Sequence, residues 1–223
     1  MPPLMLSKGA HNVGKQDYGA FNQRNIYQKI TDKRGLLLSL DALDFIGPDG
    51  YPAPAMKLRC YTYDANREAG SKMTGQVDTY LPLPVFLRFI YGVLQGDYIR
   101  LMEHRMETTV TDQGGAPLFE YFSGTPGAPP VSKRLALIPG RWDAMPDFAF
   151  HATSGLGKMG ETGMIFPAAG AKPTQSIFIH MSYDELCEMC LIGQAYTEAF
   201  IHTDFSRRLA IIRDGRSGDK GSL

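Results

Sequence analysis

The amino-acid sequence predicts an α+β fold made of a duplicated β-β-β-β-α unit, with antiparallel sheets and two helices. Two amphipathic helix patterns, at 83–105 and 182–203, each follow a stretch of alternating apolar and polar residues that is typical of a strand. A similar turn, TDKRG at 31–35 and TDQGG at 111–115, occurs near the start of each half. The chain therefore reads as two copies of one unit.

In the first half, the pattern predicts four strands and one helix. The helix begins at Leu83, and Pro84 fits its first turn because the missing N–H needs no partner there. A Gly-Pro-Asp-Gly-Tyr-Pro turn at 47–52 separates the second strand from the third. The predicted strands are 25–31, 35–43, 55–63 and 76–82.

The second half repeats this order with an extra segment. Ser182 is predicted to cap the helix, with Glu185 at the capping-box position. A Gly- and Ala-rich loop is predicted at 154–173. The predicted strands are 106–112, 117–123, 133–139, 147–153 and 176–181.

These elements divide the chain into two units that pack as one domain. The first unit spans 19–105 and the second spans 106–213. The ends, 1–18 and 214–223, are predicted to be flexible or disordered because they lack apolar periodicity.

Composition narrows the function classes. Lysine plus arginine equals aspartate plus glutamate, 23 each, which disfavours strong non-specific binding to duplex DNA but leaves room for a local basic face.

The sequence has no apolar run near the ~18 residues of a membrane helix. Its N-terminus has no signal-peptide layout. Three cysteines, an odd and low count, argue against a disulfide-stapled secreted domain. We expect a cytoplasmic protein without a membrane partner.

Strand periodicity suggests a binding surface. In MKLRCYTY at 56–63, alternate residues are Lys57, Arg59, Tyr61 and Tyr63, so one face carries cations and then phenol rings. Cations suit phosphates and rings suit unstacked bases, which predicts single-stranded nucleic-acid binding, with a plain solvated face as the alternative reading. The predicted contacts are Tyr27, Lys29, Lys57, Arg59, Tyr61, Tyr63, Tyr121, Lys133, Arg141 and Trp142. Further residues of the second unit that would supply rings and cations are Phe119, Arg134, Phe148, Phe150 and His151.

Two β-β-β-β-α units over about 22–208 resemble the Whirly family of single-stranded DNA-binding proteins and, more loosely, the Pur-type repeat proteins. The resemblance implies two crossing antiparallel sheets, helices that serve as oligomer contacts, and single-stranded DNA or RNA lying along exposed sheets. It would make Tyr27, Lys29, Lys57, Arg59, Tyr61 and Tyr63 the contacts of the first unit. The likeness is one of topology. The family's Lys-Gly-Lys-Ala-Ala-Leu-type motif is absent, so no motif residue is carried over.

Enzyme-like motifs are few. SGLGKMG at 154–160 contains a GxGxxG string, but the sequence after it cannot form the amphipathic helix of a dinucleotide site. Cys187 and Cys190 form a CxxC inside a predicted helix, away from the N-terminus that would activate them. We expect no catalytic residues, no metal site and no cofactor. The alternative to nucleic-acid binding is a protein-interaction or homo-oligomeric assembly module. An enzyme using the Gly-rich loop ranks third.

Overall fold

The computed structural model describes residues 24–31, 33–41, 55–68, 71–108, 116–139, 148–161 and 163–202. The predicted flexible ends, 1–18 and 214–223, lie outside these residues, and so do the predicted contacts Arg141 and Trp142.

The first sheet contains four antiparallel strands in the order β1-β2-β3-β4. Its strands are β1 (Arg24–Ile30), β2 (Arg34–Asp41), β3 (Ala55–Tyr63) and β4 (Met73–Pro82). The register shifts between Asn25 and Tyr27 in β1, so the side chains beyond that point change faces.

The second sheet contains β5 (Phe119–Thr125), β6 (Val131–Pro139), β7 (Phe148–Met159), β8 (Ile165–Pro167) and β9 (Gln175–Met181). The strands β5, β6 and β7 are neighbours in that order, and β7 also pairs with β9 and, near its end, with β8. The predicted loop at 154–173 is therefore partly strand, because β7 continues to Met159 and turns back as β8.

In the part of the chain that the structure describes, three helices follow the strands, where the sequence predicted two: α1 (Leu83–Leu94), α2 (Asp97–Thr108) and α3 (Tyr183–Phe200). The predicted helix at 83–105 breaks at Gly96, whose φ of 73° ends α1 in a conformation that favours glycine. The predicted strand at 106–112 is wrong in its first part, because α2 continues to Thr108. The predicted capping box is confirmed, since the Ser182 side chain accepts from the Glu185 N–H and the Glu185 carboxylate accepts from the Ser182 N–H.

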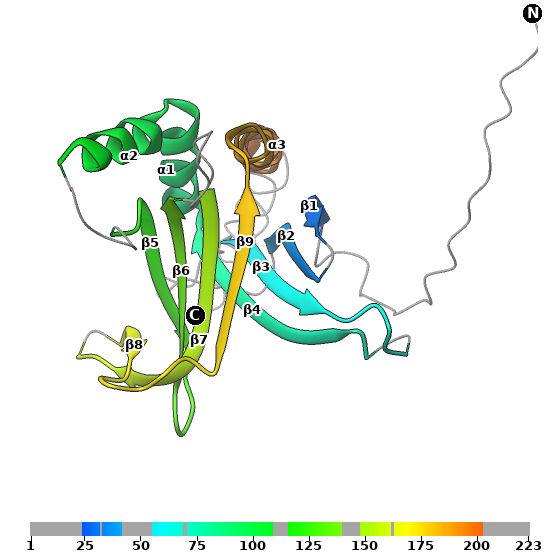
Figure 1. Ribbon diagram of the computed structural model, residues 1–223, viewed down its shortest axis with the longest axis vertical. Coiled ribbons are helices and arrows are strands. Elements are labelled where there is room, and N and C mark those ends of the chain that lie inside the picture. Colours follow the sequence, from blue (N-terminus) through cyan, green and yellow to red (C-terminus); the bar gives the residue numbers. More distant parts are fainter. Residues whose placement is uncertain are drawn as a thin grey trace, which may run out of the picture.

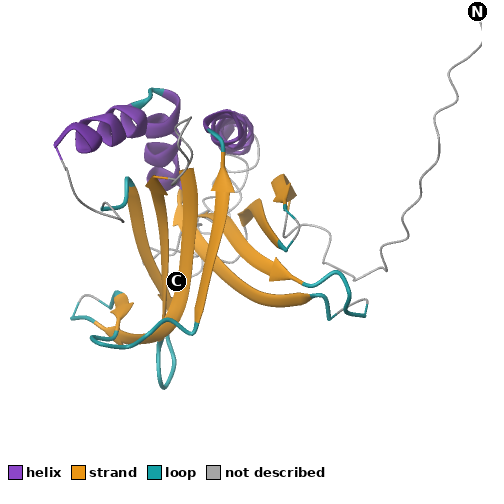
Figure 2. Cartoon of the chain, in the orientation of Figure 1, coloured by secondary structure: helices purple, strands orange, loops and turns teal. Residues whose placement is uncertain are grey.

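The two sheets cross and enclose the core between them, and the helices lie together at one end (Figures 1 and 2). The strands β3 and β4 of the first sheet pack against β9 and β6 of the second. The inner faces are apolar, with Leu58 and Val77 on the first sheet and Leu137 and Phe150 on the second.

Helix α1 closes the end of this core. The ring of Phe89 lies 4.9 Å from that of Phe119 and 5.8 Å from that of Phe150. Helix α1 also packs closely on α3, because a Cβ at Gly193 would come within 2.8 Å of the Phe86 ring. The fold is thus α+β with two antiparallel sheets, each followed in sequence by helix, as predicted.

Candidate nucleic-acid interface

The cations predicted on the first sheet are largely withdrawn from solvent. Lys57 is only 5% exposed, so its prediction as an exposed contact is wrong. Its ammonium lies 3.0 Å from an Asp78 carboxylate oxygen and 5.2 Å from the centre of the Tyr80 ring. Arg59 donates to both Asp78 oxygens, at 2.8 and 3.1 Å, and its side chain is 22% exposed. Lys57 and Arg59 therefore both pair with the carboxylate of Asp78.

Asp78 holds this cluster as an anion. Burial alone would raise the pKa of its carboxyl, but hydrogen bonds and charges from Arg59 and Lys57 outweigh burial and leave the pKa below its ordinary value. The outer face of the first sheet therefore carries an internal ion cluster where the sequence predicted a phosphate-binding strip.

Tyr27 and Lys29 face helix α3, because the β1 bulge reverses the alternation that the sequence suggested. Lys29 pairs with Glu185 at the start of α3. Burial, followed by the charges of Glu188 and Glu185, raises the pKa of Tyr27. These two predicted contacts join the first sheet to the helix layer, so their predicted place on an open face is wrong.

Tyr61 and Tyr63 are partly exposed, and both rings are held by the fold. The Tyr61 ring covers Gly35, where a Cβ would lie 2.3 Å from the ring, and the Tyr61 hydroxyl accepts from Gln28. The Tyr63 hydroxyl donates to the carbonyl of Thr31. Their centroids are 6.3 Å apart. A role for these rings in binding nucleic acid stays a prediction.

The predicted contacts on the second sheet divide between its two faces. Tyr121 and Lys133 share the face of the core strand positions, and Tyr121 packs against the core. Phe119, Phe148 and Phe150 are buried, which contradicts their expected role as accessible rings. The structure buries the face of the sheet that carries these three rings.

The opposite, outer face of this sheet carries a line of rings and cations. We call it the outer-face row; it consists of Phe178, His151, Arg134 and Phe122 on this face, together with Arg34 of β2, which contacts the β9 main chain. The strand register sets it: Phe178 pairs across with His151, and Arg134 pairs across with Phe122. Arg134 also pairs with Thr153, two positions from His151 on the same strand, which places Arg134 diagonally beside the imidazole.

Contacts within the row are close. The rings of His151 and Phe178 stack with centroids 3.9 Å apart and planes 10° apart. Arg34 reaches over from β2 and donates to the Phe178 carbonyl at 3.1 Å. His151 Nε2 lies 3.0 Å from the Ser176 hydroxyl. Burial, and then the positive charge of Arg134, lowers the pKa of His151. The imidazole is therefore held neutral at neutral pH.

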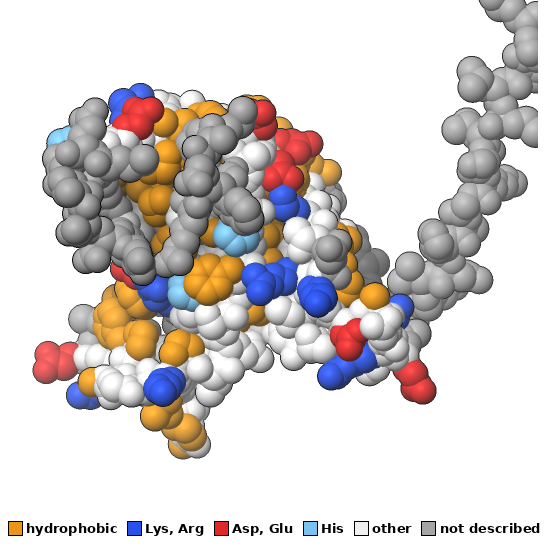
Figure 3. Space-filling view, viewed as in Figure 1, with side chains coloured by type: hydrophobic (Ala, Val, Ile, Leu, Met, Phe, Trp, Pro, Cys, Tyr) orange, Lys and Arg blue, Asp and Glu red, His pale blue; other side chains and the backbone are white. Residues whose placement is uncertain are grey.

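The row is accessible to solvent. Arg34 is exposed, and the other four members are partly exposed. Basic, histidine and hydrophobic side chains lie side by side in a band across the middle of this face (Figure 3). One carboxylate interrupts the band, because Glu120 pairs with Arg134. Their side chains are 34% and 25% exposed, so the ion pair remains open to competition from a phosphate.

Sequence reasoning identified Arg134 and His151 but missed Arg34, Phe122 and Phe178. Strand alternation could have predicted Phe122 and Phe178. Phe122 follows Tyr121 and so lies on the opposite face, and Phe178 lies in the alternating strand before Ser182. Arg34 could not be found in this way, because its place beside β9 depends on how the two sheets cross.

The two enzyme-like motifs lie in a strand and inside a helix. The GxGxxG string at 154–160 begins in β7, an extended strand that opens no helix. Cys187 and Cys190 lie inside α3, and burial raises the pKa of Cys190. Within the described residues, no group of three or more His, Cys, Asp or Glu side chains could hold a metal ion. No helix in that part of the chain is long and apolar enough to cross a membrane.

No protein-family model matches the chain, and no curated protein matches it. Among solved structures, the chain is similar to a crystal structure of the Whirly protein WHY1 from Arabidopsis thaliana. The alignment covers 82% of this chain and 92% of that chain, with 12% sequence identity and a TM-score of 0.40.

Proposed function

We propose that this protein binds single-stranded nucleic acid, without catalysis, along the outer-face row of its second sheet. The observation that carries the proposal is the alternation of cation and ring across adjacent strands: Arg34, then Phe178 and His151, then Arg134 and Phe122. Phosphates are attracted by guanidinium groups, and bases stack on rings whatever their sequence.

The dimensions of the row suit this ligand. It crosses β9, β7, β6 and β5, and neighbouring strands lie about 4.8 Å apart, so it spans about 14 Å. That length holds a few nucleotides. The His151 and Phe178 rings stack face to face, which covers one face of each ring, and an arginine lies on either side of the pair.

Because the net charge of the chain is zero, long-range electrostatic attraction should add little to its affinity for nucleic acid. With 23 basic and 23 acidic residues, affinity would come from the few local cations and from stacking. Binding would therefore show a shallow salt dependence and little sequence preference. The sheet-face mode of recognition is retained from the sequence prediction, which placed contacts on both units, but the proposed surface lies on the second sheet together with Arg34.

The test is a titration of fluorescent oligo-dT by wild type and by Phe178→Ala and Arg134→Ala. Loss of one stacking ring should weaken binding about 5- to 150-fold, because each base–ring contact is worth about 1–3 kcal/mol. Arg134→Ala should also reduce the slope of log K against log salt by about 0.7, the value for one phosphate contact on a single strand.

Matched controls come from helix α1, at the far end of the sheet. Tyr91 is 45% exposed, so Tyr91→Ala removes an accessible ring of similar size. Arg88 is exposed on the same helix, so Arg88→Ala removes one positive charge. Equal weakening by the row variants and these controls would refute the outer-face row as the binding surface, and absence of oligo-dT binding by wild type at low salt would refute the function.

A second candidate function, self-assembly, is favoured by apolar side chains exposed on the packed pair α1 and α3. Tyr91, Leu191 and Tyr196 are 45%, 57% and 41% exposed. Such residues are enriched where a helix surface meets a partner. Light scattering of wild type and Leu191→Glu tests this, since an assembly through these helices should dissociate in the variant.

A further inference from the structure

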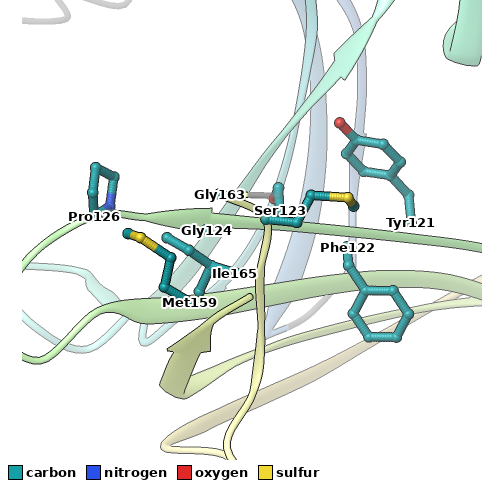
Figure 4. Close-up of a pocket in the computed structure, with 9 residues that line it drawn as sticks. Tyr121, Phe122, Ser123, Gly124, Pro126, Met159, Gly163 and Ile165 are labelled. Atoms are coloured by element: carbon teal, nitrogen blue, oxygen red, sulfur yellow. The ribbon is translucent and has the colours of Figure 1, made fainter. Parts of the chain in front are cut away.

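A small pocket lies at the edge strand β5, beside the outer-face row. Its volume is about 260 Å³, and its walls include Tyr121, Phe122, Ser123, Met159, Met164 and Ile165. Figure 4 shows Tyr121 and Phe122 pointing to opposite sides of β5, with Met159 and Ile165 approaching from the β7–β8 hairpin. The two methionines are 50% and 49% exposed, so the rim is open to solvent.

The wall of the pocket covers an unused polar group. The Ser123 hydroxyl oxygen is buried, yet it has no hydrogen-bond partner among the described residues. A buried hydroxyl without a partner is unfavourable, so a ligand that supplies one gains free energy. Strand β5 also ends the sheet, so in the described part of the chain its second edge leaves backbone N–H and C=O groups unpaired.

The pocket is continuous with the outer-face row. Phe122 belongs to both, since it lines the pocket and is the cross-strand neighbour of Arg134. The Phe122 ring also lies 6.0 Å from that of Phe166 on the β8 hairpin. A strand that follows the row from Phe178 to Arg134 therefore reaches the pocket at its next step.

We infer that this pocket receives one unstacked nucleobase of the bound strand, with the Ser123 hydroxyl hydrogen-bonding to the edge of the base. This inference rests on the proposed function and adds a site of base preference to it. Thioethers and aromatic rings suit a flat, polarizable ring, and a hydroxyl beside a free strand edge suits its polar rim. The apolar side chain of a peptide would leave the hydroxyl unpaired. At about 260 Å³ the pocket lies below the about 300–1,000 Å³ of drug-sized sites, as expected for a single base.

The test uses methyl resonances of the full-length protein with ¹³C-labelled methionine, titrated with 12-nucleotide oligo-dT and oligo-dA. Ring currents from an inserted base should shift the Met159 and Met164 methyl signals, each assigned by a Met→Leu variant. Met73 is the control, because it is 46% exposed on β4 and lies outside the pocket.

A second measurement examines base preference. Ser123→Ala should change the ratio of affinities for oligo-dA and oligo-dT by about 2- to 10-fold, the range for one hydrogen bond. Phe178→Ala, which alters the row alone, should weaken both oligonucleotides and leave this ratio unchanged.

The outcomes separate the two proposals. Shifts at Met159 and Met164 together with an altered ratio in Ser123→Ala support the pocket. Oligonucleotide binding that depends on Phe178, with both methyl signals and the ratio unchanged, overturns the pocket but leaves the function intact. Shifts caused by an extended apolar peptide, and not by oligonucleotides, would make the pocket a peptide site and overturn the inference. No binding of either oligonucleotide overturns both.

Discussion

Replacing Asp78 by asparagine removes a carboxylate that pairs with two cations of the first sheet, Lys57 and Arg59. In wild type this side chain accepts from Arg59, from Gln76 at 2.8 Å and from the Lys57 ammonium at 3.0 Å. The amide of Asp78→Asn retains the shape of the carboxylate but loses its charge. Lys57 would then be a buried cation with no anion beside it in the described structure.

The expected cost follows from the exposure of the two cations. The Arg59 side chain is 22% exposed and can turn toward water, whereas that of Lys57 is 6% exposed and cannot. Removing one partner of a buried ion pair costs about 3–5 kcal/mol. The nearby Tyr80 ring offers the ammonium a partial substitute at 5.2 Å, which favours the lower end. We expect a loss of about 3 kcal/mol in the free energy of unfolding.

Urea denaturation monitored by circular dichroism measures this loss. For a slope of about 2 kcal/mol per M, the midpoint should fall by about 1–2 M urea. The pKa of Asp78 is lowered on folding, so its stabilisation is complete above the ordinary aspartate pKa of about 3.9 and is lost as the pH falls through the lower folded pKa. The gap between wild type and Asp78→Asn should therefore narrow toward about pH 3.

The matched control is Lys57→Met, which replaces the buried ammonium by an apolar chain of similar length while Arg59 still pairs with Asp78. It should change the free energy of unfolding by less than about 1 kcal/mol, because apolar replacement of buried ions is often neutral. An Asp78→Asn loss below about 1 kcal/mol at pH 7, or a gap that does not narrow in acid, would refute the role of this cluster.

Three further predictions concern the helix break and the outer-face row. Gly96→Ala should lower the free energy of unfolding by about 1 kcal/mol, because φ is 73° there; an unchanged thermal midpoint would contradict this. The pKa of His151 is lowered on folding, so the unfolded state binds more protons, and stability should fall as the pH decreases below about 6.5. His151→Gln should flatten that part of the pH profile in urea titrations. Glu120→Gln should strengthen oligo-dT binding by up to about 5-fold, because it frees Arg134 from an exposed ion pair; weaker binding would argue against a phosphate at Arg134.

Local pattern was sufficient to predict most of the elements. The capping box at Ser182 and Glu185 sets the start of α3 through contacts three residues apart, so it can be read directly from the sequence. The alternation of 56–63 likewise predicted β3, and Leu58 and Cys60 point inward as expected. These features depend on neighbours along the chain.

Local exceptions set the limits of this reading. One extra residue in β1 reversed the faces of Tyr27 and Lys29, and Gly96 divided a helix whose apolar pattern runs through the break. Both changes involve single residues whose backbone conformation the apolar pattern does not record.

Away from the β1 bulge, the sequence by itself determined which side chains share a strand face, since a strand turns successive residues to opposite sides. The tertiary structure alone decided which faces remain accessible and which residues meet across strands. It buried Lys57 against Asp78. It also brought Arg34 beside Phe178, although these two residues lie 144 positions apart in the sequence. The physical reason is that burial and cross-strand contact depend on how the two sheets cross, and that arrangement is set by the packing of the whole core.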